Sequence, residues 1–219
     1  MSVLQKYPTP TILSLGDSAI LVRFSTSLTD AANRAAISFS RRLERDPIPG
    51  VAEIVPNLVS VLLRYDPLKV SPETIAGEIR LRLASGDENI VPPQNFTIPI
   101  RFDGLDLQDV ADSLDLSVEA FIRAHNAKPL RILATGFAPG FVYCGLHDPA
   151  LVLPRRTEVR ASVPSGSILF AAGQTAIVST EMPTGWHVIG HTGFTNFDPM
   201  HSPPTLLSAG DFIQFEALP

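Results

Sequence analysis

The first hundred residues carry two hydrophobic periods, the alternation typical of strands and the three-to-four-residue spacing typical of helices. One helix is predicted to begin at Thr29 or Asp30, either of which can cap it, and to run to about Arg45. Four apolar residues would share one face of that helix: Ala32, Ala36, Phe39 and Leu43. In chain order the pattern predicts strands at 11–15 and 19–24, this helix, strands at 51–55 and 59–65, a helix at 71–83 and a strand at 96–100. Such an order favours an antiparallel sheet with two helices on one face.

The second half of the chain has a different pattern, in which short apolar runs are separated by turn residues. Two short helices are expected at 107–113 and 117–126, and no convincing helix pattern follows Pro129. The predicted strands lie at 130–133, 158–163, 167–171, 175–179, 186–190 and 211–215. Their number and spacing fit a small β-barrel.

Charge changes along the chain at the same place as the hydrophobic pattern. Residues 1–92 hold 10 Lys and Arg with 10 Asp and Glu. Residues 129–219 hold 4 Arg with 6 Asp and Glu, and they contain no lysine. The polar, proline-containing segment 85–94 is typical of a linker. We therefore expect an α+β protein with two domains, a small N-terminal α/β domain with an antiparallel sheet at 1–90 and a β-barrel domain with two leading short helices at 91–219.

The overall composition excludes several classes of partner. Hydrophobic residues make up 45% of the 219, enough for a packed core, and the formal net charge is −5. A nucleic-acid-binding protein would show a basic stripe, and anionic lipid does not attract an acidic chain, so neither is an expected partner. The first 16 residues lack the pattern of a secretory signal, and no uncharged apolar run approaches the ~20 residues of a membrane helix. We therefore expect a cytoplasmic protein with no membrane contact.

Several common kinds of site are not indicated. None of the three lysines follows a glycine, so a P-loop is missing, as is the glycine fingerprint of a dinucleotide-binding fold. His187 and His191 have the spacing of a zinc pair on a helix, but in the predicted strand they would lie about 13 Å apart, so we expect no metal site. Cys144, the single cysteine, can form a nucleophile pair with His147, but the role of a small buried apolar residue is favoured.

The segment 136–145 is one of two that are typical of a functional surface. It combines glycines and a proline, which restrict the backbone, with the rings of Phe137, Phe141 and Tyr143. These rings can line a pocket or contact a partner. The alternative is a tight turn of the barrel whose aromatic residues fill the core.

The second such segment contains Arg155 and Arg156, two adjacent arginines in a part of the chain that is poor in arginine. A guanidinium group can hold a carboxylate or a phosphate through two parallel hydrogen bonds, although a solvated loop is the alternative. Gly173-Gln-Thr175 and Gly185-Trp186 are weaker candidates. In the former, Gln174 offers both a donor and an acceptor to an amide-like substrate.

Taken in order, these segments resemble the family that includes allophanate hydrolase subunit 1, the B subunit of 5-oxoprolinase and the histidine kinase inhibitor KipI. The matching motifs are Gly16-Asp-Ser-Ala19, Gly136-Phe-x-Pro-Gly-Phe-x-Tyr143, Pro154-Arg-Arg156, Val163-Pro-x-Gly-Ser167, Gly173-Gln-Thr175, Gly185-Trp186, Ile189-Gly-His-Thr192, Phe197-Asp-Pro199 and Gly210-Asp-x-Ile-x-Phe215. They extend over nearly the whole chain, and the ordered set is much more specific than any one motif.

The resemblance implies a small α/β domain joined to a cyclophilin-like β-barrel. It also implies the B subunit of an ATP-dependent 5-oxoprolinase, which opens 5-oxo-L-proline to L-glutamate together with its C subunit (also called allophanate hydrolase subunit 2) and its A subunit. Such a chain is not expected to be active alone. The family leaves two alternatives, a KipI-like inhibitor of a histidine kinase and the carboxyltransferase subunit of a biotin enzyme similar to urea carboxylase.

We expect the site at the interface with the C subunit, with ATP possible there as cofactor and no metal in this chain. The expected catalytic residues are Arg155, Arg156, Gln174 and His191. The expected substrate-binding residues are Phe137, Phe141, Tyr143, Thr175 and Trp186. In this scheme an arginine neutralises phosphate or carboxylate charge, Gln174 and His191 orient the amide, and Tyr143 and Trp186 form walls.

Overall fold

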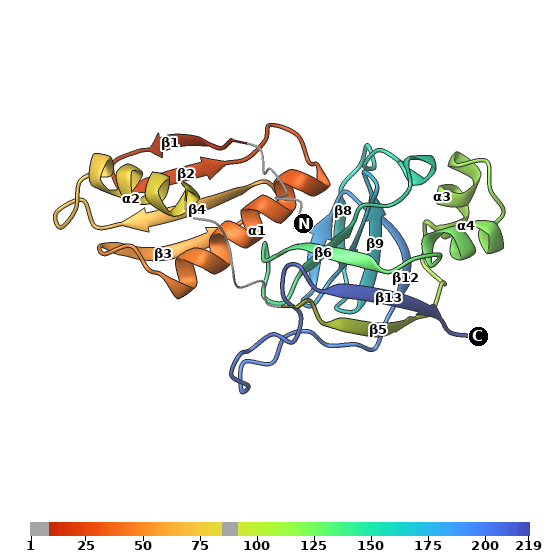
Figure 1. Ribbon diagram of the computed structural model, residues 1–219. Coiled ribbons are helices and arrows are strands. Elements are labelled where there is room, and N and C mark those ends of the chain that lie inside the picture. The colour runs from red at the N-terminus through yellow and green to blue at the C-terminus, as the bar shows by residue number, and fades with distance from the viewer. Residues whose placement is uncertain (1–8, 85–91) are drawn as a thin grey trace. The chain divides into compact units, whose positions relative to one another are not determined.

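The computed structural model describes residues 9–84 and 92–219 (Figure 1). The chain divides into two compact units, Met1–Pro92 and Pro93–Pro219. The division falls two residues after the boundary expected at residue 90, and the expected linker, 85–94, lies mostly outside the described residues. Helices and strands are present in both units, so the predicted α+β class is confirmed.

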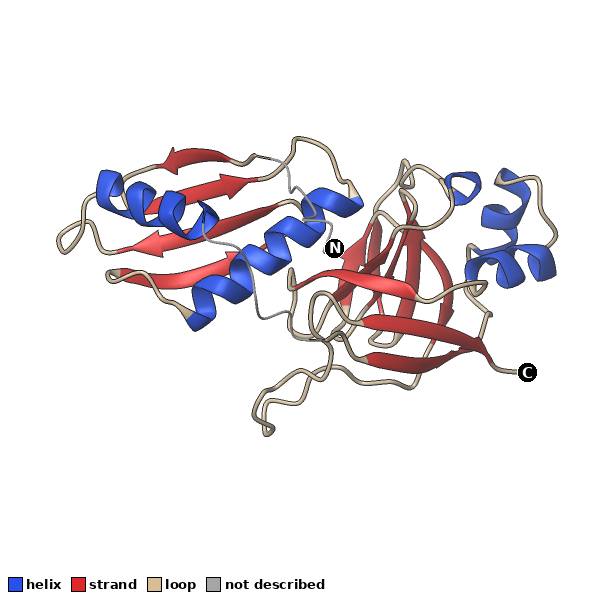
Figure 2. Ribbon diagram, in the orientation of Figure 1, coloured by secondary structure: helices blue, strands red, loops and turns tan. Residues whose placement is uncertain are grey.

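The N-terminal unit is a four-stranded antiparallel sheet with two helices on one face (Figure 2). In sheet order its strands are β1 (Thr11–Leu15), β2 (Ala19–Arg23), β4 (Ser60–Tyr65) and β3 (Val51–Pro56), and its helices are α1 (Asp30–Arg45) and α2 (Pro72–Ala84). Thr29 caps α1, because its Oγ1 accepts the Ala32 N–H at 3.2 Å. The four apolar residues predicted to share one face of α1 are all buried, in one core with Ile75 and Ile79 of α2.

The C-terminal unit is built on a seven-stranded, strongly curled sheet (Figure 1). In sheet order its strands are β12 (His187–His191), β9 (Ser167–Ala171), β10 (Gln174–Ile177), β7 (Val142–Gly145), β6 (Leu130–Thr135), β13 (Phe212–Ala217) and β5 (Asn95–Ile100). Neighbouring strands are antiparallel except β13 and β5, which are parallel. The two edges meet just beyond β5, where Arg101 and His191 exchange backbone hydrogen bonds of 2.9 and 3.0 Å. This bridge closes the curled sheet into a barrel-like form, as the sequence predicts.

Shorter elements cover both faces of this sheet. They are helices α3 (Leu107–Ser113) and α4 (Val118–His125), the 3-10 helix η1 (Pro149–Leu151), and the two-stranded ribbon of β8 (Arg160–Val163) and β11 (Met182–Thr184). The helices contribute Val110 and Phe121 to the core inside the curl. The ribbon contributes Val163 and Met182 to a second core outside it.

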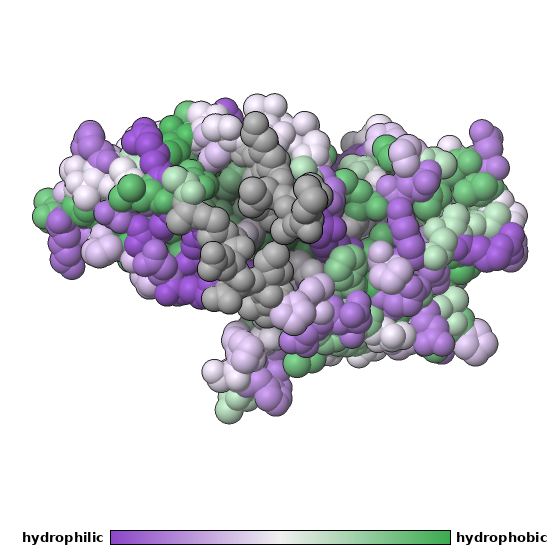
Figure 3. All heavy atoms as spheres, in the orientation of Figure 1, coloured by the Kyte–Doolittle hydropathy of each residue, from purple (hydrophilic) through white to green (hydrophobic). Residues whose placement is uncertain are grey.

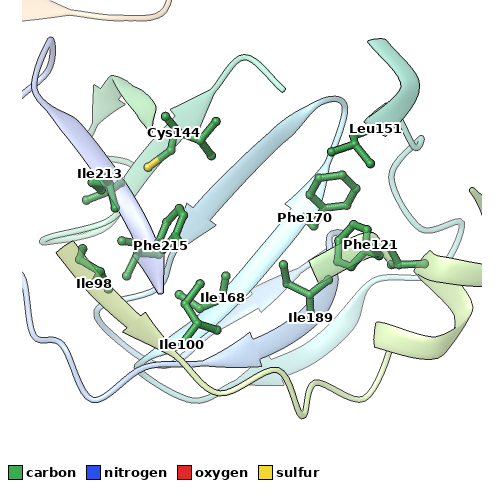
Figure 4. Close-up of a cluster of buried hydrophobic side chains, with 14 of the residues drawn as sticks. Ile98, Ile100, Phe121, Cys144, Leu151, Ile168, Phe170, Ile189, Ile213 and Phe215 are labelled. Atoms are coloured by element: carbon green, nitrogen blue, oxygen red, sulfur yellow. The ribbon is translucent and has the colours of Figure 1, made fainter. Parts of the chain in front are cut away.

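Side chains alternate between the two faces of the curled sheet, and each face has its own hydrophobic core. The inner core receives side chains from all seven strands, and Figure 4 shows Phe170 and Phe215 among those that converge inside the curl. The outer core is smaller and lies under the ribbon. In β7, Val142 and Cys144 belong to the inner core and Tyr143 packs against the outer one. Neighbouring residues of this strand therefore point to opposite faces of the sheet.

Two strands, β7 and β11, and the one-turn helix η1 were not among the predicted elements. The tight turn that was the alternative interpretation of residues 136–145 occupies only the first part of that segment, and β7 begins at Val142. A strand of four residues offers too few alternations to stand out from an adjacent glycine-rich turn. Cys144 is fully buried in β7, which confirms its predicted role as a small apolar residue.

The surface drawn in Figure 3 intersperses hydrophilic and hydrophobic residues. Across the described ranges, 9–84 and 92–219, no helix combines the length and apolar character needed to cross a membrane.

Replacing Gly190 by alanine is expected to destabilise the barrel at its closure. A Cβ at this position would lie 2.3 Å from the Arg101 carbonyl oxygen, so the bridge between β5 and β12 must shift. We expect Gly190→Ala to lower the free energy of unfolding by about 1–3 kcal/mol. Urea denaturation followed by fluorescence of Trp186, the only tryptophan, reports on this unit. Gly193→Ala is the matched control because nothing lies within 4 Å of its Cβ position, and equal unfolding midpoints for the two variants would contradict the expectation.

Candidate functional site

Four aromatic rings from three segments form a continuous row at the outer face of the sheet. The Tyr143 ring centroid lies 4.7 Å from that of Phe141 and 6.0 Å from that of Trp186. Phe137 extends the row, with its ring centroid 5.8 Å from that of Phe141. Trp186 and Phe141 are buried, Tyr143 is half-buried, and Phe137 exposes 79% of its surface. The row therefore begins in the outer core at Trp186 and ends in solvent at Phe137.

Arg155 lies over the buried end of this row. Its guanidinium carbon is 5.8 Å from the centre of the Trp186 ring, a distance at which the cation and the ring face attract each other. Burial raises the pKa of the Tyr143 hydroxyl, and the nearby charge of Arg155 acts in the opposite direction. Tyr143 is therefore a neutral phenol at neutral pH, and it lies close enough to Arg155 for the two groups to interact electrostatically.

Gln174 lies on the same face as Tyr143. It is the first residue of β10, opposite Gly145 of β7, because Thr175 pairs with Cys144 and Ala176 with Tyr143. Gln174 and Tyr143 are thus diagonal neighbours, typically about 7–8 Å apart and somewhat less between their Cβ atoms. The Gln174 side chain is buried, and its Oε1 has no hydrogen-bond partner within the described part of the chain.

Six of the nine expected site residues therefore gather on one face. We call them the outer-face cluster: Phe137, Phe141, Tyr143, Arg155, Gln174 and Trp186. The other three expected residues lie elsewhere, and each has different contacts: Arg156, Thr175 and His191.

Arg156 points away from its neighbour Arg155 and into an ion cluster centred on Asp106. The buried Asp106 carboxylate accepts hydrogen bonds from Arg156 Nη1 at 2.5 Å, from Arg160 Nη2 at 2.8 Å and from the Val188 N–H at 2.8 Å. Arg156 also donates its backbone N–H to the Gly185 oxygen at 2.8 Å. These contacts tie the arginine loop to β12 and give Arg156 a structural partner.

Thr175 faces the inside of the curl, between two buried histidines. Its Oγ1 lies 2.8 Å from Nε2 of His125 and 2.8 Å from Nε2 of His147. His125 Nδ1 lies 2.6 Å from the Asn126 Oδ1, which only accepts, so the proton is assigned to Nδ1. The Thr175 hydroxyl then donates to His125 and accepts from His147, so it joins the two rings.

Both of these histidines are neutral at neutral pH. Burial lowers the pKa of His125 to about 4. Burial, together with the charges of His125 and Lys128, lowers the pKa of His147 to about 3. Burial also raises the pKa of the Cys144 thiol, so Cys144 and His147 do not form a thiolate pair.

His191 lies at the closure of the barrel, where its Nδ1 is 2.6 Å from Oδ1 of Asp103. His187, the residue after Trp186, lies four positions earlier in β12. At roughly 3.3 Å per residue, this separates His187 from His191 by about 13 Å along the strand. His187 contacts the Pro154 oxygen through Nε2 at 3.1 Å. Within the described residues no three His, Cys, Asp or Glu side chains are grouped so that they could hold a metal ion.

Asp106, Arg160 and His125 are the polar residues that the sequence did not single out. Asp106 contacts partners 50, 54 and 82 positions away. His125 reaches Thr175 across 50 positions. No local pattern marks such contacts, because they form only when distant strands pair.

Comparison with known proteins places most of the chain in one family. The carboxyltransferase domain, subdomain C and D, matches residues 10–207. The B subunit of the 5-oxoprolinase of Bacillus subtilis (strain 168) is 34% identical over 218 residues, which cover 93% of this chain and 91% of the relative. The B subunit of the Escherichia coli O157:H7 5-oxoprolinase is 32% identical over 210 residues, covering 92% and 93%.

Solved structures show the same fold. The crystal structure of TTHA0988 superposes with a TM-score of 0.81 at 34% identity, over 92% of this chain but 40% of that one. This chain therefore spans about two fifths of that protein. PH0987 from Pyrococcus horikoshii matches at 31% identity and a TM-score of 0.55, over 95% and 97% of the two chains. The Kluyveromyces lactis urea amidolyase shares the fold, with a TM-score of 0.78 at 18% identity, over 100% of this chain and 15% of that one.

Removing the charge of Asp106 is expected to destabilise the C-terminal unit strongly. Asp106→Asn leaves two arginines without their shared carboxylate, and breaking a buried ion pair costs about 3–5 kcal/mol. The free energy of unfolding can be measured with Trp186 fluorescence, which should also change because Arg156 no longer anchors the loop beside Gly185. Asp109→Asn, which neutralises an exposed carboxylate in α3, the helix that follows Asp106, is the control. A similar small loss in both variants would show that Asp106 does not anchor the loop.

Stability is expected to fall as the pH falls from about 6.5 towards 4. The pKa values of His125 and His147 in the folded protein lie below the ordinary value of 6.5, so the unfolded chain binds more protons in this range. Between pH 7.5 and 5 the loss should reach about 2 kcal/mol for each buried histidine. Urea denaturation at the two pH values tests this, and His147→Gln should reduce the pH dependence. An unchanged pH dependence in His147→Gln would contradict the assignment.

Proposed function

This chain belongs to the family of the carboxyltransferase domain, subdomain C and D, and we propose that it is the B subunit of a 5-oxoprolinase. The observation that carries the proposal is the match to two curated relatives of that name, at 34% and 32% identity over more than nine tenths of the chain. The family match over residues 10–207 includes every residue of the outer-face cluster.

The proposed reaction opens the cyclic amide 5-oxo-L-proline to L-glutamate at the expense of ATP. Resonance stabilises a lactam, so the carbonyl carbon is a poor electrophile. Transfer of the γ-phosphoryl group to the carbonyl oxygen releases ADP and activates that carbon. Water then adds to the carbon, and the ring C–N bond breaks with a proton going to nitrogen, which leaves an acyl phosphate. A second water hydrolyses the acyl phosphate to the side-chain carboxylate of glutamate and inorganic phosphate. Groups that neutralise developing negative charge lower these barriers.

In this scheme the outer-face cluster is this chain's contribution to a site shared with the C and A subunits. Arg155 would neutralise an anionic group, Gln174 would orient the amide, and Tyr143 and Trp186 would form walls. Phe137 is a large exposed apolar residue held at a φ of 82°, as expected of a residue that contacts a partner. The other three expected residues would stabilise the fold and would not contact the substrate, because each is paired with another side chain: Arg156, Thr175 and His191.

ATP is expected at the shared interface, because the sequence lacks a P-loop and offers no local phosphate cradle. Since the reaction needs ATP, we place the assembly in the cytoplasm. The carboxyltransferase subunit of a biotin enzyme is the second candidate, favoured by the family that matches residues 10–207.

Reconstitution with the A and C subunits of the same organism tests the proposal. The chain alone should release no glutamate from 5-oxoproline, and the three subunits together should release glutamate only when ATP is present. Size-exclusion chromatography should show this chain co-eluting with the C subunit. Full activity of the chain alone would contradict the need for partners. A complex that is inactive on 5-oxoproline but transfers carboxyl groups from a biotin carrier would favour the second candidate.

A further inference from the structure

Strand β1 forms one edge of the N-terminal sheet, and its outer side has no partner strand among the described residues. In sheet order β1 is first and β3 is last, so β1 pairs only with β2, and β3 only with β4 (Figure 1). An edge strand presents a row of backbone N–H and C=O groups that can pair with another chain. Proteins normally protect such an edge with charged residues, a proline or a β-bulge.

The two edges of this sheet differ in that protection. On β3, Glu53 forms an ion pair with Arg64 at 3.0 Å, and the strand ends in Pro56. Its register with β4 also shifts between Val51 and Glu53. The β1 strand, Thr11–Leu15, contains no charged residue and no proline, and its register with β2 runs without a shift. The β1 edge is therefore open to pairing, whereas the β3 edge is protected.

A row of apolar side chains crosses the sheet on the face opposite the helices and ends at the β1 edge. Leu13 of β1 pairs with Leu21 of β2, which pairs in turn with Leu62 of β4. Leu62 pairs with Val55 of β3. The core under the helices receives the alternate residues of these strands, so these four side chains face away from it and stay partly exposed. An antiparallel copy of β1 would place Leu13 opposite its equivalent and continue the row into that copy.

The charges beside β1 are complementary under a twofold axis. Arg23, at one end of the β1–β2 pair, lies opposite Thr11. Asp17, at the other end, is exposed in the turn that follows Leu15. Neither forms an ion pair within the ranges 9–84 and 92–219. When two β1 strands pair antiparallel, the Thr11 end of each copy meets the Leu15 end of the other. The Arg23 side chain of each copy then lies at the same end of the joint sheet as Asp17 of the other.

We propose that two copies of this chain associate through β1, and that the two strands pair antiparallel about a twofold axis at Leu13. The two four-stranded sheets then form one continuous sheet, by the strand addition that edge strands commonly support. A five-residue edge is a small interface, so we expect a dimer that dissociates on dilution. The inference is independent of the proposed function, because it uses only the N-terminal unit and no residue of the outer-face cluster.

Sedimentation velocity of the full chain, at concentrations from about 1 to about 200 μM, tests the proposal. The 23.6 kDa chain should convert reversibly to a species of twice that mass as the concentration rises. A single species of 23.6 kDa over the whole range would overturn the proposal.

One substitution made at each edge shows which edge is used. Leu13→Lys places two like charges directly opposite each other at the twofold axis, so it should raise the dissociation constant at least about tenfold. Val55→Lys is the matched control, because it introduces the same side chain on the same face at the β3 edge, and it should leave the dissociation constant unchanged. Circular dichroism establishes that both variants are folded. Equal dissociation constants in the two variants would show that the copies do not meet at β1.

A charge-reversal pair tests the antiparallel arrangement without altering β1 itself. Asp17→Lys and Arg23→Glu should each associate at least about tenfold more weakly than the original chain, because each brings like charges together at both ends of the junction. An equimolar mixture of the two variants should associate more tightly than either variant alone, since every facing pair then has opposite charges. A mixture that associates no better than the separate variants would contradict the proposed arrangement.

Discussion

Gln174 and Thr175 are neighbours in β10, yet they point to opposite faces of the same curled sheet. This alternation is a consequence of strand geometry, and closure of the sheet between Arg101 and His191 turns it into a difference between inside and outside. The inner face is filled by apolar side chains from all seven strands. The outer face has a smaller core and carries the candidate site. The role of a strand residue therefore depends first on which face of the sheet its side chain occupies, and this face alternates from one residue to the next.

The polar groups of the two faces differ in how completely they are paired. Inside, the Thr175 hydroxyl is hydrogen-bonded to both His125 and His147, and both histidines stay neutral. Outside, Arg155 has no carboxylate within ion-pair distance and the Gln174 Oε1 has no hydrogen-bond donor among the described residues. Buried polar groups are normally satisfied, so unpaired ones on one face indicate where a ligand or a partner protein binds.

The sequence predicted most of the fold because most of it depends on local periodicity. Helix α1, with its Thr29 cap and its buried apolar face, follows from spacing and capping alone. The β7 strand was missed because its four residues follow a glycine-rich turn. Motif order indicated all six residues of the outer-face cluster, but it also grouped Arg156, Thr175 and His191 with them. The order of motifs carries no information on which face a side chain occupies, and Asp106, which pairs with Arg156, lies 50 positions away.

The adjacent positions 174 and 175 allow the most direct test of this division between faces. In the reconstituted enzyme, Gln174→Ala and Thr175→Val can be compared for kcat/KM per folded molecule and for the free energy of unfolding. We expect Gln174→Ala to lose activity with little change in stability. Thr175→Val should lose about 1–3 kcal/mol of stability, because both histidines lose their shared partner, and should retain activity well below its unfolding temperature. Loss of activity in Thr175→Val at full stability, with Gln174→Ala fully active, would contradict the account.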